Sequence, residues 1–309
     1  MTLQQLRYLI AIAEYGSINA AAQNLYASQS NLSNAVKDLE REFGITIFTR
    51  SNRGVTLTNE GADLLGYARQ VIEQADMLEE HYSHEGASHR RLAISTQHYA
   101  FSVEAFVRMV ESTGDSRDFD YILRECATGQ IIEDVRTFRS ELGILYLDSF
   151  NSHVLEKALA DNNLSFTPLF DARVHVFVGE HHPLASKELI ELSDLEQYPR
   201  YSFEQGSANS FYYSEEPFSH LPHTGNIRYS DRGTLTNLLT SFEGYTLSTG
   251  VLSAEMNKGI VSIPLDTDET MRVGYVMHKE RRADDLLQRY IDMLKEVIAE
   301  NPTVTADKR

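Results

Sequence analysis

Residues 17–44 read "SINAAAQNLYASQSNLSNAVKDLEREFG", and this stretch decides the fold of the first part of the chain. Ser17 and Ser28 stand where a hydroxyl can accept a hydrogen bond from a backbone N–H in the first turn of a helix. Between them, three consecutive alanines leave room for a second helix to approach closely. The stretch therefore predicts a helix over residues 18–25, a tight turn, and a further helix that begins after Ser28.

The helix after Ser28 has an apolar face and a polar face. Its apolar stripe consists of Leu32, Val36, Leu39 and Phe43, and the opposite face is centred on Ser30, Asn34, Lys37 and Arg41, with Gln29 and Asn31 in the first turn. Amides carry a donor and an acceptor and can read adenine, serine can serve either base class, and basic groups suit phosphates. This pattern indicates a DNA-reading helix-turn-helix, and the alternative is a small helical core with a merely solvated polar face.

A first helix and a β-hairpin flank this pair. Apolar residues recur at helical spacing from Leu3 onward, and the predicted helix ends at Gly16. Residues 45–48 and 55–57 are typical of two short strands joined by the turn "RSNRG". The hairpin would form a wing that carries Arg50 and Arg53 beside the DNA-reading helix.

A long amphipathic helix is predicted to follow the wing, with Thr58 as its cap. Its apolar or small residues recur at alternating spacings of four and three, which is a heptad pattern. They are Leu57, Gly61, Leu64, Ala68, Val71, Ala75, Leu78 and Tyr82. Such a seam favours pairing with a second copy, because a two-fold dimer presents two reading heads to successive major grooves of a palindromic site. The alternative is a long helix packed on its own domain.

Length and composition limit the class of protein. The chain has 309 residues and no apolar run long enough to cross a membrane, and its N-terminus turns polar at Gln4 and Gln5, so we expect a cytoplasmic protein with two or three domains. Its single cysteine, Cys126, excludes an internal disulfide and a cysteine-based zinc site. A redox role of this lone thiol is left open by the sequence.

The net charge of −17 is distributed unevenly along the chain. Residues 1–60 hold five basic and five acidic groups and are neutral overall, whereas the remaining residues hold 23 basic and 40 acidic groups. Phosphate attraction supplies most sequence-independent affinity for nucleic acid, so the acidic part is an unsuitable partner for DNA. Only the neutral first part fits that role.

Beyond Arg90 the sequence alternates between strand-like and helix-like segments. The strand-like segments are "RLAIST" (91–96), "ELGILYL" (141–147), "RVHVFVG" (173–179), "GYTLST" (244–249) and "VGYVMHK" (273–279), and the helix-like ones include 102–111, 128–138 and 234–243. This α/β alternation predicts parallel sheets covered by helices, with a ligand pocket at the carboxyl ends of the strands, just after Thr96.

At this point a family resemblance becomes specific. The order of helix, "SINAAAQNLYASQSNLSNAVKDLEREFGITIFTR", wing and "LTNEG" resembles the N-terminal domain of the LysR-type transcriptional regulators, and "HHPLASKELIELSDLEQYPRYSFEQG" (181–206) is similar to their effector domain. The resemblance covers nearly the whole chain. It implies an α/β protein with an N-terminal winged helix-turn-helix, a long dimerisation helix, and a two-subdomain effector domain like periplasmic binding proteins.

The resemblance also implies domain boundaries and DNA contacts. The winged helix-turn-helix would span 1–58, the linker helix and hinge 59–89, and the effector domain 90–300, with subdomain I at 91–165 and 268–300, subdomain II at 166–267, and a flexible tail at 301–309. The base-reading and phosphate-contacting positions would be Gln29, Ser30, Asn31, Ser33, Asn34 and Lys37, with Arg50 and Arg53 in the wing. Ser30 stands where proline is frequent in the family, and Asn34 where a basic residue is frequent.

In the same way the resemblance places a small-molecule effector between the two subdomains. It would touch Ser95, Thr96, Gln97 and His98 after the first strand, together with Thr128 and the segment that contains Phe203, Glu204 and Gly206. Ser95 and Thr96 can donate to a carboxylate, aided by backbone amides at the next helix start. The alternative is that these are ordinary capping residues.

Other chemistry has little support in the sequence. The cluster in "HYSHEGASH" (81–89) suits a solvated linker better than a metal site, and no phosphate loop or metalloprotease spacing is present. We therefore expect no metal and no cofactor beyond a co-inducer of unknown identity, and no enzyme activity. Expected partners are double-stranded DNA with an interrupted palindromic operator, the effector, RNA polymerase by resemblance, and further copies in a homodimer or homotetramer. The rival interpretation is a small-molecule binding protein or enzyme whose N-terminal domain only mediates assembly.

Overall fold

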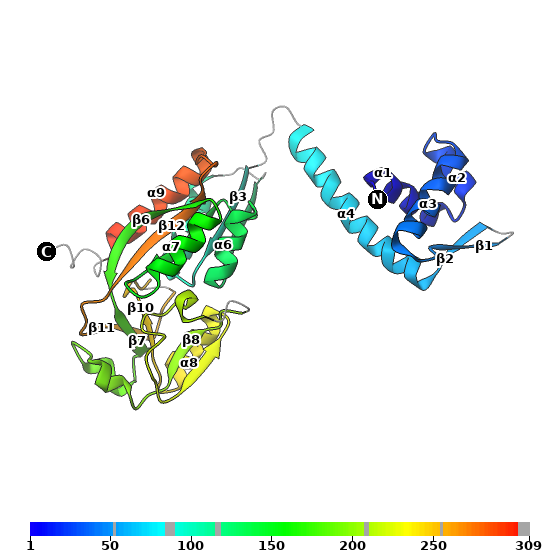
Figure 1. The fold of residues 1–309 in the computed structure, drawn as a ribbon. Coiled ribbons are helices and arrows are strands. Elements are labelled where there is room, and N and C mark those ends of the chain that lie inside the picture. Colours follow the sequence, from blue (N-terminus) through cyan, green and yellow to red (C-terminus); the bar gives the residue numbers. More distant parts are fainter. Residues whose placement is uncertain (52–53, 84–89, 115–118, 207–209, 254–255, 302–309) are drawn as a thin grey trace. The chain divides into compact units, whose positions relative to one another are not determined.

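The chain divides into two compact units, Met1–His89 and Arg90–Arg309. The structure is a computed structural model, and it describes residues 1–51, 54–83, 90–114, 119–206, 210–253 and 256–301. Within these ranges no helix is both long and apolar enough to span a bilayer. The two units are described separately below (Figure 1).

Three helices open the first unit, at the positions that the sequence predicted. They are α1 (Leu3–Tyr15), α2 (Ile18–Asn24) and α3 (Gln29–Phe43). The Ser17 hydroxyl accepts a hydrogen bond from Ala20 N, and that of Ser28 accepts one from Asn31 N at 3.2 Å, so both predicted caps are confirmed. Gly16 ends α1 in the left-handed conformation, as expected for a helix C-terminus.

The wing is a two-stranded antiparallel hairpin of β1 (Phe48–Ser51) and β2 (Gly54–Leu57). The predicted strand at 45–48 was therefore placed about three residues too early. After α3, the N–H of Ile45 still bonds to the Glu40 carbonyl and that of Ile47 bonds to the Glu40 carboxylate. These bonds complete the end of the helix, so pairing with β2 begins only at Phe48, opposite Leu57.

Helix α4 (Asn59–Ser83) begins directly on the wing. Thr58 caps it as predicted, because its hydroxyl accepts a hydrogen bond from Gly61 N at 2.9 Å. A Cβ atom at Gly61 would overlap the carbonyl oxygen of Ile47, so only glycine allows this close approach. The core of the unit joins α1, α2, α3, Ile47 just before β1, Phe48 in β1, and the inner face of α4.

The second unit is built on a five-stranded mixed sheet. Its strands are β3 (Arg90–Thr96), β4 (Phe119–Glu125), β5 (Leu142–Leu147), β6 (Leu164–Arg173) and β12 (Thr270–His278), in the order β4-β3-β5-β12-β6. The first three are parallel, and β12 runs antiparallel to both of its neighbours. Every residue of β5 is buried, because the strand lies at the centre of the sheet.

Helices cover both faces of this sheet (Figure 1). The helices are α5 (Ala100–Ser112) and α9 (Asp285–Glu300) on one face, and α6 (Thr128–Arg136) and α7 (Ser152–Asp161) on the other. Side chains such as Phe101 and Tyr290 fill the first layer, and Ile131 and Leu155 fill the second. Asn301 caps the end of α9.

A smaller antiparallel sheet forms the other half of the second unit. It consists of β10 (Thr246–Ser248), β7 (His175–Gly179) and β11 (Ile260–Pro264), beside the parallel pair β8 (Arg200–Phe203) and β9 (Asn226–Tyr229). Helix α8 (Arg232–Ser241) packs on β7, and the short turns η1 (Pro183–Ser186), η2 (Leu192–Leu195) and η3 (Phe211–Tyr213) complete it.

Two expectations about this unit were wrong in detail. The sheets are not purely parallel, because β12 and β6 run antiparallel in the large sheet and the small sheet is antiparallel throughout. The predicted start of subdomain II at 166 is also too early, because β6 continues in the large sheet to Arg173, opposite Thr270. The alternating sequence of a strand does not show at which residue its pairing with the neighbouring strand ends.

Candidate nucleic-acid interface and ligand pocket

The polar face of α3 lies on the surface of the first unit. Five of the side chains predicted to contact DNA are exposed on it, namely Gln29, Ser30, Asn31, Asn34 and Lys37. Opposite them, Leu32, Val36 and Leu39 are buried against α1 and α2. The amphipathic pattern therefore sets which side chains a partner can reach.

Ser33 is the exception among the predicted DNA contacts on α3. Its exposed fraction is only 8%, so its side chain belongs with the inner face of the helix. At 100° per residue, position 33 lies next to the apolar stripe rather than at the centre of the polar face. We therefore remove Ser33 from the predicted base-reading set.

The wing arginines are described only in part. Arg50 lies in β1, where its backbone pairs with Val55, and its side chain is outside the described residues. Arg53 lies outside the described residues altogether. The base of the wing is held to the helices, because the N–H of Val55 donates to the Gly16 carbonyl at 2.9 Å and a Cβ at Gly54 would overlap the same oxygen.

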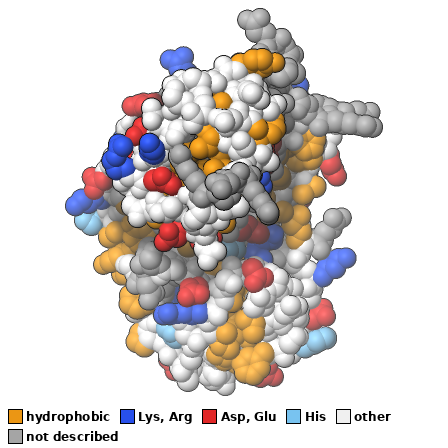
Figure 2. All heavy atoms as spheres, turned by 90° about the vertical axis from the view of Figure 1, so that its right-hand side faces the viewer, with side chains coloured by type: hydrophobic (Ala, Val, Ile, Leu, Met, Phe, Trp, Pro, Cys, Tyr) orange, Lys and Arg blue, Asp and Glu red, His pale blue; other side chains and the backbone are white. Residues whose placement is uncertain are grey.

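Among the described side chains of the first unit, several basic groups lie beside acidic ones. Arg7 lies 2.6 Å from Asp76 and Arg41 lies 3.0 Å from Asp38, so two of them are already partly neutralised. On the face drawn in Figure 2, Lys and Arg side chains stand in small separate groups among acidic ones.

Helix α4 divides the predicted apolar seam between two faces. Gly61 and Ala68 pack against the unit's own core, together with Ile72, which the seam did not include. Val71 and Leu78 are 41% and 60% exposed, and they form one stripe with Tyr67, which is 70% exposed. The alternative of packing on the helix's own domain therefore holds for Gly61 and Ala68, and pairing with a second copy stays a prediction for the exposed stripe. The side chain of Tyr82 lies outside the described residues, as do His84, Glu85 and His89.

In the second unit, three of the four residues predicted to bind an effector after β3, namely Ser95, Thr96 and Gln97, are completely buried. The hydroxyl of Ser95 donates to the Asp134 carboxylate at 2.8 Å and lies 2.8 Å from the Ser140 hydroxyl. The Thr96 hydroxyl donates to the carbonyl of Gln97. Both hydroxyls thus bind groups of the protein itself, and no surface of either is open to a ligand.

Gln97 and Thr128 belong to the same buried network. The amide nitrogen of Gln97 donates to the Thr128 hydroxyl at 2.6 Å, and its oxygen accepts from Tyr99 and from the N–H of Tyr146. The N–H of Thr128, at the start of α6, donates to the side-chain oxygen of Gln205 at 3.1 Å. The network therefore ties β3 and α6 to the loop after β8.

His98, the residue after Gln97, contacts Glu215. The ring Nδ1 of His98 lies 2.8 Å from Glu215 Oε2, and its ring stacks on Phe203 with centroids 3.7 Å apart. Burial lowers the pKa of His98, but the charge and hydrogen bond of Glu215, with smaller contributions from Glu125 and Glu216, raise it above its ordinary value on balance.

Glu216, the residue after Glu215, is also buried, but its carboxylate binds Phe203 and Ser214. Its carboxylate accepts hydrogen bonds from the N–H of Phe203 at 2.8 Å and from the Ser214 hydroxyl at 2.9 Å. Burial raises the pKa of Glu216 to about 7, with a further rise from Glu215 and an opposing effect of Arg200. Arg200 in turn donates to the carbonyls of Pro217 and Phe218 and fixes the segment in place.

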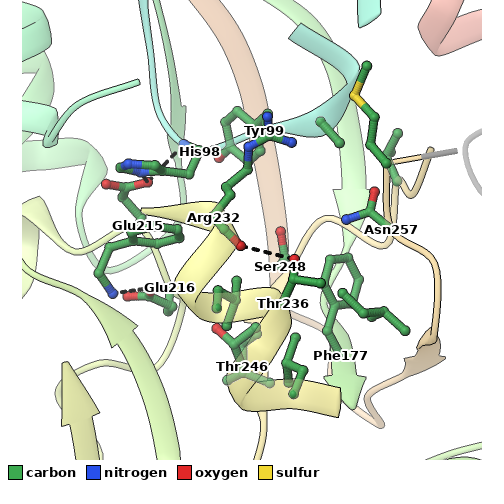
Figure 3. Close-up of a pocket in the computed structure, with 18 of the residues that line it drawn as sticks. His98, Tyr99, Phe177, Glu215, Glu216, Arg232, Thr236, Thr246, Ser248 and Asn257 are labelled. Carbon is green, nitrogen blue, oxygen red and sulfur yellow. Dashed lines mark hydrogen bonds and ion pairs between the residues drawn. The ribbon is translucent and has the colours of Figure 1, made fainter. Parts of the chain in front are cut away.

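A pocket of about 350 Å³ opens on the other side of His98 (Figure 3). Its apolar walls come from β7, α8, β10 and the start of β11, and its polar groups include Arg232, Thr236, Ser248 and Asn257. Arg232 Nε lies 2.5 Å from Glu125 Oε1, an ion pair without hydrogen-bond geometry. The volume and the mixed lining are typical of a site for a small organic molecule.

Only two of the eight predicted effector contacts, His98 and Phe203, line this pocket. Glu204 is exposed, and its N–H bonds to the Tyr229 carbonyl. Gly206 is exposed with a positive φ of 58°. Gln205 lay within the predicted segment from Phe203 to Gly206, but the sequence did not lead us to name Glu215, Glu216 or any residue of α8 as an effector contact. The available signal was the pair of adjacent acids at 215 and 216.

Cys126 follows β4 and is half-buried. Burial raises the pKa of its thiol to about 11, the nearby Asp134 adds to this, and a hydrogen bond with Ser95 opposes it. The thiolate is the reactive form of cysteine, so this environment disfavours reaction with oxidants.

Comparison with protein families gives two matches. Residues 3–62 match the model described as "Bacterial regulatory helix-turn-helix protein, lysR family", and residues 117–299 match "LysR substrate binding domain". The second match alone covers more than half of the chain. Between them they include α3, the wing, and every residue described above in the pocket from Phe177 to Asn257.

Similar proteins align with this chain over nearly their full length. The "DNA-binding transcriptional dual regulator OxyR" of Escherichia coli is 26% identical over 311 residues, which covers 96% of this chain and 95% of that protein. The "Hydrogen peroxide-inducible genes activator" of Haemophilus influenzae is 25% identical over 287 residues, 90% of this chain and 91% of that protein. Among solved structures, a C206 mutant of Corynebacterium glutamicum OxyR is 22% identical, with coverage of 99% and 96% and a TM-score of 0.52.

Proposed function

Because the chain belongs to the LysR family of DNA-binding transcriptional regulators, we propose that it reads an operator through the exposed face of α3 and is controlled by a small molecule in the pocket beside His98. Its N-terminal domain binds DNA and its C-terminal unit contains the effector-binding domain. Its relatives of known function are regulators rather than enzymes. The site of action is the cytoplasm.

One observation carries the DNA-reading part of the proposal. The exposed face of α3 presents two amides and a hydroxyl in its first turn, followed by Asn34 and Lys37. Amides recognise base edges through paired hydrogen bonds, and each such pair contributes about 1–3 kcal/mol of discrimination between bases. Sequence reading therefore falls to Gln29, Asn31 and Asn34, and phosphate contact to Lys37.

The test is binding to the chain's own upstream DNA, measured by fluorescence anisotropy at fixed salt. Gln29→Ala and Asn34→Ala should each weaken specific binding by about 5- to 150-fold, the equivalent of one lost base contact. Gln4→Ala removes an exposed amide from α1 and serves as the control. If both α3 variants are folded and bind as tightly as the parent, the proposed reading face is wrong.

The exposed stripe on α4 supports a dimer as the DNA-binding form. Tyr67, Val71 and Leu78 leave an apolar strip uncovered on a helix whose other face is already packed. A two-fold pair of such helices would bring two α3 helices to an interrupted palindromic operator. A homotetramer built from two such dimers and contact with RNA polymerase complete the proposal by analogy with the family.

Control by the effector requires two arrangements of the protein that bind it with different affinity. We place the effector in the pocket formed by His98, Phe177 and α8 instead of at Ser95 and Thr96, because those two hydroxyls are buried and bonded. A thermal-shift screen of metabolites identifies ligands, since binding to the folded state raises apparent stability. For a hit, Ser248→Ala should reduce the shift while the exposed Ser193→Ala leaves it unchanged.

Peroxide sensing does not follow from the names of the relatives. The chain has one cysteine, so an internal disulfide cannot form, and the pKa of that thiol is raised. A half-buried thiol with little thiolate at neutral pH is a poor sensor of hydrogen peroxide. We therefore propose an effector that is bound without reaction at Cys126.

A further inference from the structure

The carboxylate of Glu215 is bound by the protein as a ligand would be. Oε2 accepts a hydrogen bond from the backbone N–H of His98 at 3.0 Å and lies 2.8 Å from the same residue's ring Nδ1. Oε1 accepts one from the amide of Gln205 at 3.1 Å. Both oxygens are thus held by donors, in a site where the side chains of Glu215 and His98 are only 5% and 6% exposed.

These donors come from separate parts of the effector-binding unit. His98 lies between β3 and α5, 117 residues before Glu215 in the chain. Gln205 follows β8, and its own oxygen accepts from the N–H of Thr128 at the start of α6. The carboxylate therefore joins the large sheet to the small one at the place where the sequence led us to expect the carboxylate of an effector.

We infer that Glu215 is an internal carboxylate ligand of the cleft, and that it makes the adjoining pocket select effectors that lack a carboxylate. This inference rests on the proposed effector role of that pocket. The N–H of His98 and the amide of Gln205 already bind Glu215, so an incoming carboxylate finds the same donors occupied.

The charges around the pocket lead to the same conclusion. Glu215 and Glu216 both line the pocket, and Figure 3 shows Glu215 beside His98. The basic side chains of the lining are already paired with acids, Arg232 with Glu125 and His98 with Glu215. A second carboxylate near these acids would be repelled in a partly desolvated site. Hydroxyl and amide groups of Thr236, Ser248 and Asn257 suit an uncharged ligand with an apolar body.

The inference is tested by removing the Glu215 carboxylate and supplying a free carboxylate in its place. In Glu215→Ala the donors lose their acceptor and a carboxylate-sized space opens beside them. Acetate at 100 mM should raise the melting temperature of the full-length variant by about 4 °C over sodium chloride of equal ionic strength. The parent should show no such difference, because its site is filled.

Glu215→Gln is the matched control, since its amide keeps the volume of the side chain and blocks the space. Acetate should not stabilise this variant beyond chloride. If Glu215→Ala is insoluble in chloride, the yield of soluble protein after refolding from urea in acetate or in chloride gives the same comparison. Equal behaviour in both salts, or an equal effect of acetate on the glutamine variant, would overturn the inference.

Adding benzoate tests whether the carboxylate space of Glu215→Ala is continuous with the pocket. Its ring can extend from the carboxylate position toward Phe203 and Phe177, so it should stabilise Glu215→Ala more than acetate at the same concentration. Benzamide, which has the same ring without the charge, should not distinguish this variant from the parent. A benzoate effect no larger than that of acetate would separate the two sites and remove the selectivity argument.

The acetate and benzoate measurements do not depend on DNA binding. Failure of the parent to bind its operator would contradict the proposed function. Failure of acetate to stabilise a folded Glu215→Ala would contradict only the internal-ligand inference.

Discussion

The two units use polar side chains in opposite ways. On α3 in the first unit, all of the residues predicted to recognise a partner except Ser33 are exposed. Around β3 in the second unit, Ser95, Thr96 and Gln97 are fully buried and bind other residues of the protein. A partner reaches the first set without changing the fold, whereas a ligand at the second set would first have to break internal hydrogen bonds.

This difference teaches which kind of site a local pattern reveals. A helix with a 3.6-residue period has one outer face, and the residues on it can be found by counting. A cleft is made by segments far apart in the chain, so the partners of a hydroxyl that follows a strand depend on which distant segment packs there. Here that segment contains Gln205 and Glu215, and they occupy the position expected for the effector.

The largest expected effect concerns the first unit. Gly61→Ala should destabilise it by about 3 kcal/mol or more, because the added Cβ overlaps the Ile47 carbonyl oxygen and the backbone must shift. Gly66→Ala, in the same helix with open space around it, should instead stabilise by about 0.5–1 kcal/mol. Urea denaturation followed by circular dichroism measures both. Equal effects would show that α4 does not rest on the wing as described.

The exposed stripe of α4 gives the next effect. The double variant Val71→Asp and Leu78→Asp should weaken dimerisation by at least about 100-fold, since two charges per chain would enter an apolar contact. Sedimentation velocity over a concentration series measures the change. Ala62→Asp places the same charge on another exposed side of the helix and should leave the dimer intact. A parent that is monomeric at all concentrations would contradict the dimer itself.

A pH-dependent effect of similar size belongs to the second unit. The pKa of Glu216 is raised to about 7, above that of an unfolded glutamate, so its stabilising contribution is full below pH 4.5 and decreases as the pH rises through 7. The loss should be on the order of 3 kcal/mol. Glu216→Gln removes this dependence, so its stability relative to the parent should increase between pH 5 and pH 8.

Urea titrations of the parent, Glu216→Gln and the exposed Glu188→Gln at several pH values provide the measurement and its control. A parallel pH dependence in the parent and Glu216→Gln would mean that Glu216 is ionised in the folded protein at all of these values.

The smallest effect is expected at Cys126. Cys126→Ser should change stability by about 1 kcal/mol or less, because the thiol is half-buried and its substitute keeps the hydrogen bond with Ser95. Hydrogen peroxide should leave operator binding of the parent unchanged, and iodoacetamide should react with Cys126 far more slowly than with glutathione at pH 7.5. Peroxide-dependent binding that disappears in Cys126→Ser would restore a redox role.

Many local features were predictable from single segments. The caps at Ser17, Ser28 and Thr58 were right because each depends on a hydroxyl and the backbone three residues away. Strands β3, β5, β7, β10 and β12 were recognised from apolar runs. Strands β4, β6, β8, β9 and β11 were missed, and of these β4 and β6 have mixed, partly exposed patterns. Strand β1 was displaced because a contact with Glu40 delays its pairing.

The sequence by itself determined that α3 presents amides to the outside and that the chain alternates strands and helices after Arg90, because both follow from periodicity and local hydrogen bonding. Only the tertiary structure decided that α4 divides its apolar residues between its own core and the surface, and that Glu215 meets His98 from 117 residues away. Contacts between distant segments depend on how the sheets pack, and no local pattern in the chain encodes them.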